Sequence, residues 1–231
     1  MATPFTVVAL EVVDSTQDEA RHRFSGDPLV VIAVAQRAGR GRTGTTWESA
    51  PRAVAASLAW KPEWPESGLA RLTLVAGLAA LDVIGVDGGL KWPNDLMVGG
   101  GKAGGILTER FGDLVVTGLG LNLYWPGPPA GFAALADADP GADAARRFGE
   151  AWAARLLARA AAGPEAWGHA EYVARCVTIG EEIAWDPAGR GTATGVAPDG
   201  GLVVMTADGE VVLESGAVSM VRPRSGPGGH G

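Results

Sequence analysis

The chain has 231 residues, of which 47% are hydrophobic and 19% charged, and its formal net charge is −7. This composition is that of a globular protein and excludes a largely disordered chain. The acidic balance argues against a general nucleic-acid binder, which would more often be basic. The single cysteine, Cys176, cannot form an internal disulfide, and the N-terminus has no basic segment followed by an apolar one. We therefore expect a cytoplasmic protein that carries no secretion signal.

Apolar and β-branched runs predict strands and two long helices in the first three quarters of the chain. We expect strands over 5–13, 30–36, 53–60, 90–98, 106–110 and 114–123, and helices over 69–84 and 144–162. Residues 72–86 form an apolar run that is short for a membrane span and contains Asp82, so we expect a core helix. Phe148, Trp152 and Leu156 recur at helical spacing and are also expected in the core.

The pattern changes after Val177, where short apolar runs alternate with turn signals such as Asp199-Gly200-Gly201. Strands at this spacing predict a small β-barrel or sandwich. We therefore expect an α/β (α+β) fold, with a mixed sheet flanked by helices followed by a small C-terminal β-barrel. The expected boundaries are a main domain over 1–177, the barrel over 178–222 and a disordered tail over 223–231.

Two arginines alternate with three glycines in the loop Gly39-Arg40-Gly41-Arg42-Thr43-Gly44. Glycine lets the backbone approach a ligand closely, and arginine presents a planar fork that fits carboxylate or phosphate. The spacing formally matches the dinucleotide-binding fingerprint, but that motif needs a helix that starts in the loop. Here Thr45-Thr46-Trp47 and Pro51 lead into another predicted strand. The composition favours a loop that closes over an anion, and a plain surface turn stays open as the alternative.

Two further segments carry unusual polar residues. In Lys91-Trp92-Pro93-Asn94-Asp95, the proline removes a ladder donor, so the break can turn Asn94 and Asp95 into a cavity. Asp95 could hold magnesium through a hard oxygen ligand. Gly99-Gly100-Gly101-Lys102 resembles half of a P-loop but lacks its first glycine and its magnesium-binding hydroxyl. What remains is a lysine on a glycine-rich hairpin. An ordinary turn and a solvated lysine are equally open readings of these two segments.

Taken together and in order, these segments resemble the biotin protein ligase family. The resemblance begins at Ser15-Thr16, continues through the glycine–arginine loop and the two segments above, and reaches Gly118-Leu119-Gly120-Leu121-Asn122 and the C-terminal barrel. Members of this family adenylate biotin with ATP and then pass the biotinyl group to a lysine on a carboxylase carrier domain. The resemblance therefore implies biotin and ATP as substrates, Mg²⁺ as cofactor and a biotin carboxyl carrier domain as partner.

The resemblance also implies roles for individual positions. The implied biotin-binding residues are Ser15, Thr16, Gln36, Gly39, Arg40, Gly41, Lys102, Gly105 and Gly120. The implied ATP-binding residues are Arg42, Trp47, Lys91, Asn94, Lys102 and Asn122. Lys102, Arg42 and Arg40 are the implied catalytic residues, and Asp95 is the implied magnesium ligand.

The sequence departs from the family pattern at several points. Gln17 stands where the family often has Asn, and Thr45 stands where a basic residue is common. No room precedes Ser15 for the DNA-binding domain of some members, so we expect a ligase without a repressor role, as a monomer or weak homodimer that binds neither nucleic acid nor membrane. Two alternatives remain: a lipoate-type acyltransferase of the same fold, which would lack the arginine loop, and a catalytically inactive biotin-binding module, against which Lys102 and both arginines speak.

Overall fold

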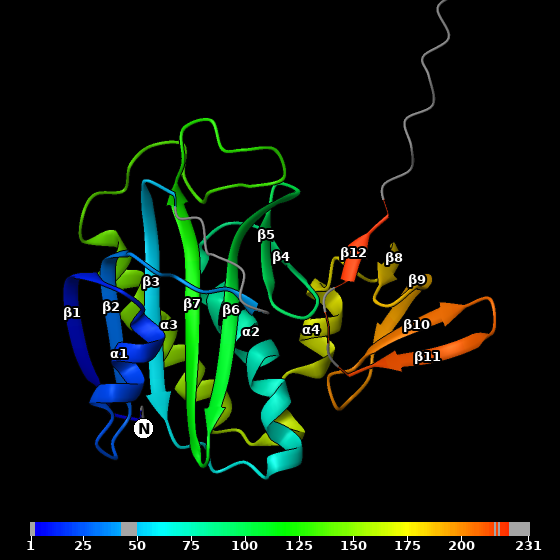
Figure 1. Cartoon of the computed structure of the whole chain (residues 1–231), viewed down its shortest axis with the longest axis horizontal. Helices are drawn as coiled ribbons and strands as arrows, with labels where there is room; N and C mark the ends of the chain where they lie inside the picture. The colour runs from blue at the N-terminus through cyan, green and yellow to red at the C-terminus, as the bar shows by residue number, and fades with distance from the viewer. Residues whose placement is uncertain (1–2, 43–49, 215, 217, 222–231) are drawn as a thin grey trace, which may run out of the picture.

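Two β-sheets organise the chain in the computed structural model, which describes residues 3–42, 50–214, 216 and 218–221 (Figure 1). The first sheet has the order β1-β2-β3-β7-β6-β5-β4; β1 and β2 pair in parallel and the other neighbours are antiparallel. Its strands are β1 (Thr6–Val13), β2 (Leu29–Gln36), β3 (Arg52–Trp60), β4 (Gly88–Lys91), β5 (Asp95–Val98), β6 (Gly101–Phe111) and β7 (Leu114–Tyr124).

The helices cover the two faces of this sheet unequally. The helix α1 (Thr16–Arg23) lies against β2, β3 and β7 on one face, whereas α2 (Leu72–Ile84) and α3 (Ala144–Ala160) pack side by side on the other (Figure 1). The remaining helical segments are α4 (His169–Arg175), next to β4, and the short 3₁₀ helices η2 (Glu66–Arg71) and η3 (Pro164–Ala166). The face that carries α1 is therefore only partly covered, and the candidate site lies there.

The main core forms between the sheet and the pair α2–α3. Most residues of α2 are buried, as expected of a helix that is apolar on all sides. Trp152 and Leu156 are fully buried, Phe148 packs against them, and the indole nitrogen of Trp152 donates to the carbonyl oxygen of Ala76 at 3.1 Å. The stretch Glu66–Ile84 has the length and apolarity of a membrane span, but most of it is buried inside the fold. The prediction of a core helix for this run is thus confirmed.

The expected mixed α+β architecture is confirmed, with two local differences. The run 90–98, predicted as one strand interrupted at Pro93, is a hairpin of β4 and β5 with Trp92–Asn94 in its turn. The strand β6 begins at Gly101, five residues before the predicted start, because β5 and β7 pair with its glycine-rich first half from both sides. Gly99 and Gly100 have φ angles of 56° and 80°, which a tight two-residue hairpin requires.

The second sheet is antiparallel and lies beside the first (Figure 1). It has the order β11-β10-β9-β8-β12, formed by β8 (Glu182–Trp185), β9 (Gly189–Val196), β10 (Leu202–Thr206), β11 (Gly209–Leu213) and β12 (Val218–Met220). Short strands were predicted in this region, but α4 and β12, which are seven and three residues long, were not. The predicted disordered tail, 223–231, lies outside the described residues.

Hydrogen bonds join the C-terminal region to the β4–β5 turn. The backbone N–H of Trp92 donates to the hydroxyl of Thr178 at 2.8 Å, and its indole N–H donates to the carbonyl oxygen of Gly200 at 2.9 Å. Ile183 and Leu202 of the second sheet belong to the same hydrophobic cluster as Trp92. The C-terminal sheet therefore supports the turn that carries Asn94 and Asp95, and the predicted boundary at residue 177 runs through a shared core.

Replacing Thr178 should loosen this support. The change Thr178→Val keeps the side-chain volume but leaves the buried N–H of Trp92 without its acceptor, which typically costs about 1–3 kcal/mol. We expect the midpoint of thermal unfolding to fall by roughly 2–10 °C, as measured by calorimetry. Thr194→Val, which alters an exposed threonine of β9, is the matched control and should change the midpoint little. Equal midpoints for the two variants would contradict a structural role for Thr178.

Candidate functional site

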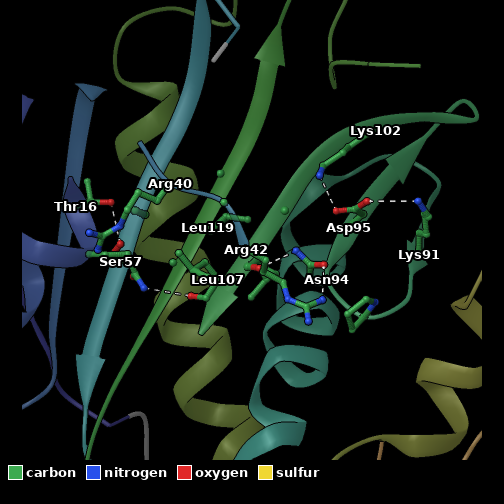
Figure 2. A pocket seen from close by; sticks show the side chains of 18 of the residues that line it. Thr16, Arg40, Arg42, Ser57, Lys91, Asn94, Asp95, Lys102, Leu107 and Leu119 are labelled. Carbon is green, nitrogen blue, oxygen red and sulfur yellow. Dashed lines mark hydrogen bonds and ion pairs between the residues drawn. The ribbon is translucent and has the colours of Figure 1, made fainter. Parts of the chain in front are cut away.

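A cavity of about 410 Å³ opens between the N-terminus of α1, the strands β3, β6 and β7, the β4–β5 turn and the loop after β2 (Figure 2). It gathers most of the positions that the sequence analysis selected. Those in its lining are Ser15, Thr16, Gln36, Arg40, Gly41, Arg42, Lys91, Asn94, Asp95, Lys102, Gly105 and Gly120. Segments separated by more than a hundred residues in sequence therefore meet at one site.

One end of the cavity carries a cluster of neutral polar side chains, Thr16, Gln36 and Ser57, and we call it the uncharged end. The hydroxyl of Thr16 donates to Gln36 Oε1 at 3.0 Å, and the backbone N–H of Thr16 donates to the same oxygen at 2.8 Å. Ser57 Oγ lies 2.8 Å from Thr16 Oγ1 and completes the cluster. Thr16 and Ser57 are buried. Because Gln36 Oε1 accepts both bonds from Thr16, its amide nitrogen remains as the donor on the other side of the carboxamide.

The local structure explains how Ser15 and Thr16 reach this end. Ser15 occupies the N-cap position of α1, but its side chain makes no capping hydrogen bond. The first turn of α1 is instead fixed by the bonds of Thr16 to Gln36. Because Thr16 at the start of α1 bonds to Gln36 of β2, the neighbouring Ser15 lies in the cavity lining.

Small residues and leucines form the middle of the cavity. Gly118 and Gly120 of β7 and Gly105 of β6 line its floor, and Leu107 and Leu119 lie between the two ends (Figure 2). A Cβ atom at Gly118 would come within 2.9 Å of Gln17 Oε1 and 3.2 Å of Ser57 Oγ. Glycine at this position therefore leaves room for the polar side chains at the uncharged end, while the leucines make the middle apolar.

The opposite end carries several charged side chains, and we call it the cationic end. Lys102 Nζ lies 2.7 Å from Asp95 Oδ1, and Lys91 Nζ lies 3.9 Å from Asp95 Oδ2 (Figure 2). Lys102 comes from the start of β6 and Asp95 from the start of β5, so the hairpin between these strands brings them together. Two lysines against one carboxylate leave this end with a net positive charge.

Arg42 adds a further positive charge to the cationic end. Its NH1 donates to Asn94 Oδ1 at 3.3 Å and to the carbonyl oxygen of Gly216 at 3.2 Å, while Asn94 Nδ2 donates to the carbonyl oxygen of Ile106 at 3.0 Å. Partial burial lowers the pKa of the Arg42 guanidinium, and the nearby Asp95 carboxylate partly offsets that effect. Arginine stays protonated in proteins, so Arg42 supplies a half-buried cation at a position fixed by Asn94.

The acidic groups of the described residues offer Mg²⁺ a single ligand at this site. No cluster of three or more His, Cys, Asp or Glu side chains occurs in the part of the chain that the structure describes. Asp95 is the acid of the cavity, and both of its oxygens face lysine ammonium groups. Such a site fits a cation that arrives with phosphate oxygens and water as its other ligands, which is the usual way that Mg²⁺ is held beside a nucleotide.

Among the described residues, two sequence-selected positions do not line the cavity. Asn122 is buried in β7, where its side chain accepts from the backbone N–H of Ala50 at 3.4 Å and donates to the carbonyl oxygen of Ala133 at 3.1 Å. Gly39 is buried at the start of the glycine–arginine loop. Trp47 lies outside the described residues. Nucleotide contacts for Asn122 and Trp47, and biotin contact for Gly39, therefore stay predictions.

The sequence analysis missed Ser57. This residue lies in the apolar run of β3, where nothing but its polarity distinguishes it from its neighbours. A serine in the middle of a strand with fully buried flanking positions is a signal that could have marked it, because a buried hydroxyl needs a partner. Its partner, Thr16, lies 41 residues earlier in the chain, and the sequence alone does not pair the two.

Comparison with known proteins decides the family. Residues 9–122 match the model of the biotin/lipoate A/B protein ligase family. The biotin–[acetyl-CoA-carboxylase] ligase of Mycobacterium tuberculosis is 34% identical over 218 residues, which cover 80% of this chain and 79% of that protein. The chain belongs to the biotin protein ligase family. The ligase of the same name from Paracoccus denitrificans is 37% identical over 123 residues, 48% of this chain and 51% of that protein.

The fold agrees with this family. The biotin protein ligase from Aquifex aeolicus in complex with biotin and ATP superposes with a TM-score of 0.80 at 24% identity, covering 94% of this chain and 99% of that one. The ligase from Leishmania major in complex with biotinyl-5-AMP gives a TM-score of 0.64 at 24% identity, again over 94% of this chain. Both likenesses include the C-terminal region, so the arrangement of two sheets is that of the family.

Proposed function

We propose that this enzyme activates biotin with ATP as biotinyl-5′-AMP and transfers the biotinyl group to a lysine of a biotin carboxyl carrier domain. The observation that carries the proposal is the order of chemistry along the cavity, which runs from an uncharged hydrogen-bonding end through an apolar middle to a cationic end. Biotin has the same order, with a ureido ring, an aliphatic chain and a carboxylate. The names of the relatives and their bound biotin, ATP or biotinyl-5-AMP support the same assignment.

The uncharged end suits the ureido ring. A ureido group donates two N–H bonds and accepts at its oxygen, so it needs partners of both kinds. The hydroxyls of Thr16 and Ser57 and the carboxamide of Gln36 can supply both. Lipoate, the substrate of the alternative function, has a dithiolane ring without strong hydrogen-bonding groups and would leave these buried groups unmatched, which is costly.

The cationic end suits the adenylation step. The biotin carboxylate oxygen attacks the α-phosphorus of ATP, a new P–O bond forms, and the bond to the pyrophosphate leaving group breaks. Carboxylate and triphosphate repel each other, and Lys102, Lys91 and Arg42 offset that repulsion and stabilise charge that develops on the α-phosphate. Mg²⁺, when bound with ATP near Asp95, would neutralise further phosphate charge. Asn94 and Asp95 hold Arg42 and Lys102 in place through the bonds described above.

The transfer step uses the mixed anhydride formed in this way. The neutral amine of an acceptor lysine attacks the biotinyl carbonyl carbon, an amide bond forms, and AMP leaves with the electron pair of the broken C–O bond. The acceptor on a carrier domain of a biotin-dependent carboxylase is part of the proposal, as is action in the cytoplasm. Enclosure of the adenylate in the cavity would limit its hydrolysis.

Pyrophosphate exchange tests the first step without the second. If Lys102 and Arg42 serve adenylation, exchange of labelled pyrophosphate into ATP should require biotin and Mg²⁺ but no carrier domain. Addition of a carrier domain should then produce a biotinylated lysine and consume the adenylate. Exchange that depended strictly on the carrier would exclude a two-step scheme, and exchange supported by lipoate but not by biotin would favour the acyltransferase alternative.

A further inference from the structure

The two arginines of the glycine–arginine loop occupy different surroundings. Arg42 lies at the cationic end, as described above. Arg40 NH2 instead donates to Asp18 Oδ1 of α1 at 2.8 Å and lies 3.6 Å from Glu109 Oε2 of β6. Figure 2 shows Arg40 near Thr16 and Ser57, away from Lys102 and Asp95. Arg40 therefore pairs with two carboxylates near the uncharged end of the cavity.

Glu109 is itself held in place by a buried amide. Gln17 Nε2 donates to Glu109 Oε2 at 3.0 Å, which is the same oxygen that faces Arg40. The amide nitrogen also lies 3.4 Å from the carbonyl oxygens of Leu107 and Val116, and the Gln17 side chain is buried. These contacts fix the amide of Gln17, and the amide in turn orients the carboxylate toward Arg40.

We propose that Gln17, Glu109 and Asp18 are positioning residues that act through Arg40. Through Arg40, they hold the glycine–arginine loop against α1 and β6. They thereby shape the wall of the uncharged end. Arg40 governs the affinity for biotin, and Arg42 and Lys102 govern the chemistry. This inference rests on the proposed function, because it assigns the uncharged end to the biotin ring.

The length of the Gln17 side chain supports the network. An asparagine side chain is one methylene shorter, so from the same backbone its amide would not reach Glu109 and both carbonyl oxygens together. The longer side chain therefore has a specific use here, namely to reach the carboxylate that faces the loop.

The test removes the charge of the two carboxylates. In the double variant Asp18→Asn/Glu109→Gln, biotin affinity measured by isothermal titration in 50 mM NaCl should fall about fivefold, the upper range for exposed ion pairs. The rate of pyrophosphate exchange at saturating biotin should stay within about twofold. At 500 mM NaCl the wild-type affinity should approach that of the variant, because salt screens exposed charges. A merely structural role would not create this salt dependence.

A mutant cycle shows whether the carboxylates act through Arg40. Arg40→Met should weaken biotin binding as much as the double variant does, and the triple variant should be no weaker than Arg40→Met alone. Glu19→Gln is the matched control, because Glu19 lies on the same helix but forms its exposed ion pair with Arg23, at 2.7 Å. This control should leave biotin affinity unchanged.

Trypsin cleavage gives a readout that does not depend on biotin. Pairing with Asp18 and Glu109 should protect the bond after Arg40 in the ligand-free protein, so the double variant should be cut there several times faster than the wild type. Unchanged cleavage, additive losses in the mutant cycle, or a fall in exchange rate without a change in biotin affinity would each overturn the inference. If the double variant is cleaved faster but the wild-type protein binds no biotin, the anchoring of Arg40 would be supported and the proposed function refuted.

Discussion

The variant Lys102→Ala should form biotinyl-5′-AMP about a hundredfold more slowly than the wild type, which is the usual scale for loss of one electrostatic donor at a reacting centre. Lys102 Nζ lies 2.7 Å from Asp95 and contributes a compact positive charge to the end of the cavity where the carboxylate and the α-phosphate are proposed to meet. Without it, Arg42 and Lys91 remain, and the carboxylate of Asp95 is less compensated. The measurement is biotin-dependent pyrophosphate exchange at saturating biotin and ATP.

Stability should change little in the same variant. The backbone N–H and carbonyl groups of Lys102 bond to Gly131 and Ala133 in any case, and a partly exposed ion pair typically contributes at most about 1 kcal/mol. Lys61→Ala, which removes an exposed lysine paired with Asp113 at 2.9 Å, is the matched control and should retain full exchange. Full activity of Lys102→Ala, or a loss of activity explained entirely by early unfolding, would contradict a role in the chemistry.

The variant Thr16→Val should lose biotin affinity by about one order of magnitude while it keeps most of its maximal rate. The change keeps the shape of the side chain but removes the hydroxyl that joins Gln36 and Ser57. A buried polar group without a partner costs about 1–3 kcal/mol, equivalent to roughly 5- to 150-fold in affinity. Isothermal titration with biotin measures the affinity, and pyrophosphate exchange at saturating biotin measures the rate.

Thr6→Val is the control for this second variant, because Thr6 is exposed at the start of β1, far from the uncharged end. The contrast with Lys102→Ala is the sharper test: one variant should affect chiefly binding and the other chiefly rate. If Thr16→Val instead reduced the maximal rate and left the affinity intact, the ureido ring would not lie at the uncharged end and the proposed orientation of biotin would be reversed.

The sequence by itself determined much of this protein. Periodicity located α2, α3 and most of the strands, because long apolar runs have few ways to be buried. Residue types with special backbone or charge properties, such as the alternating glycines and arginines and the proline in the β4–β5 turn, marked the segments that meet at the cavity. These signals are local, and a single segment suffices to see each of them.

The tertiary structure decided which polar groups face each other. Ser57 pairs with Thr16 across 41 residues, and Arg40 pairs with Glu109 because β6 and α1 flank the loop. No local pattern encodes these contacts, since they depend on the order of strands in the sheet. The two loop arginines look equivalent in sequence, yet one faces carboxylates at the uncharged end and the other lies at the cationic end. The loop runs past α1 and β6 at Arg40 and past the β4–β5 turn at Arg42, and this placement produced the difference.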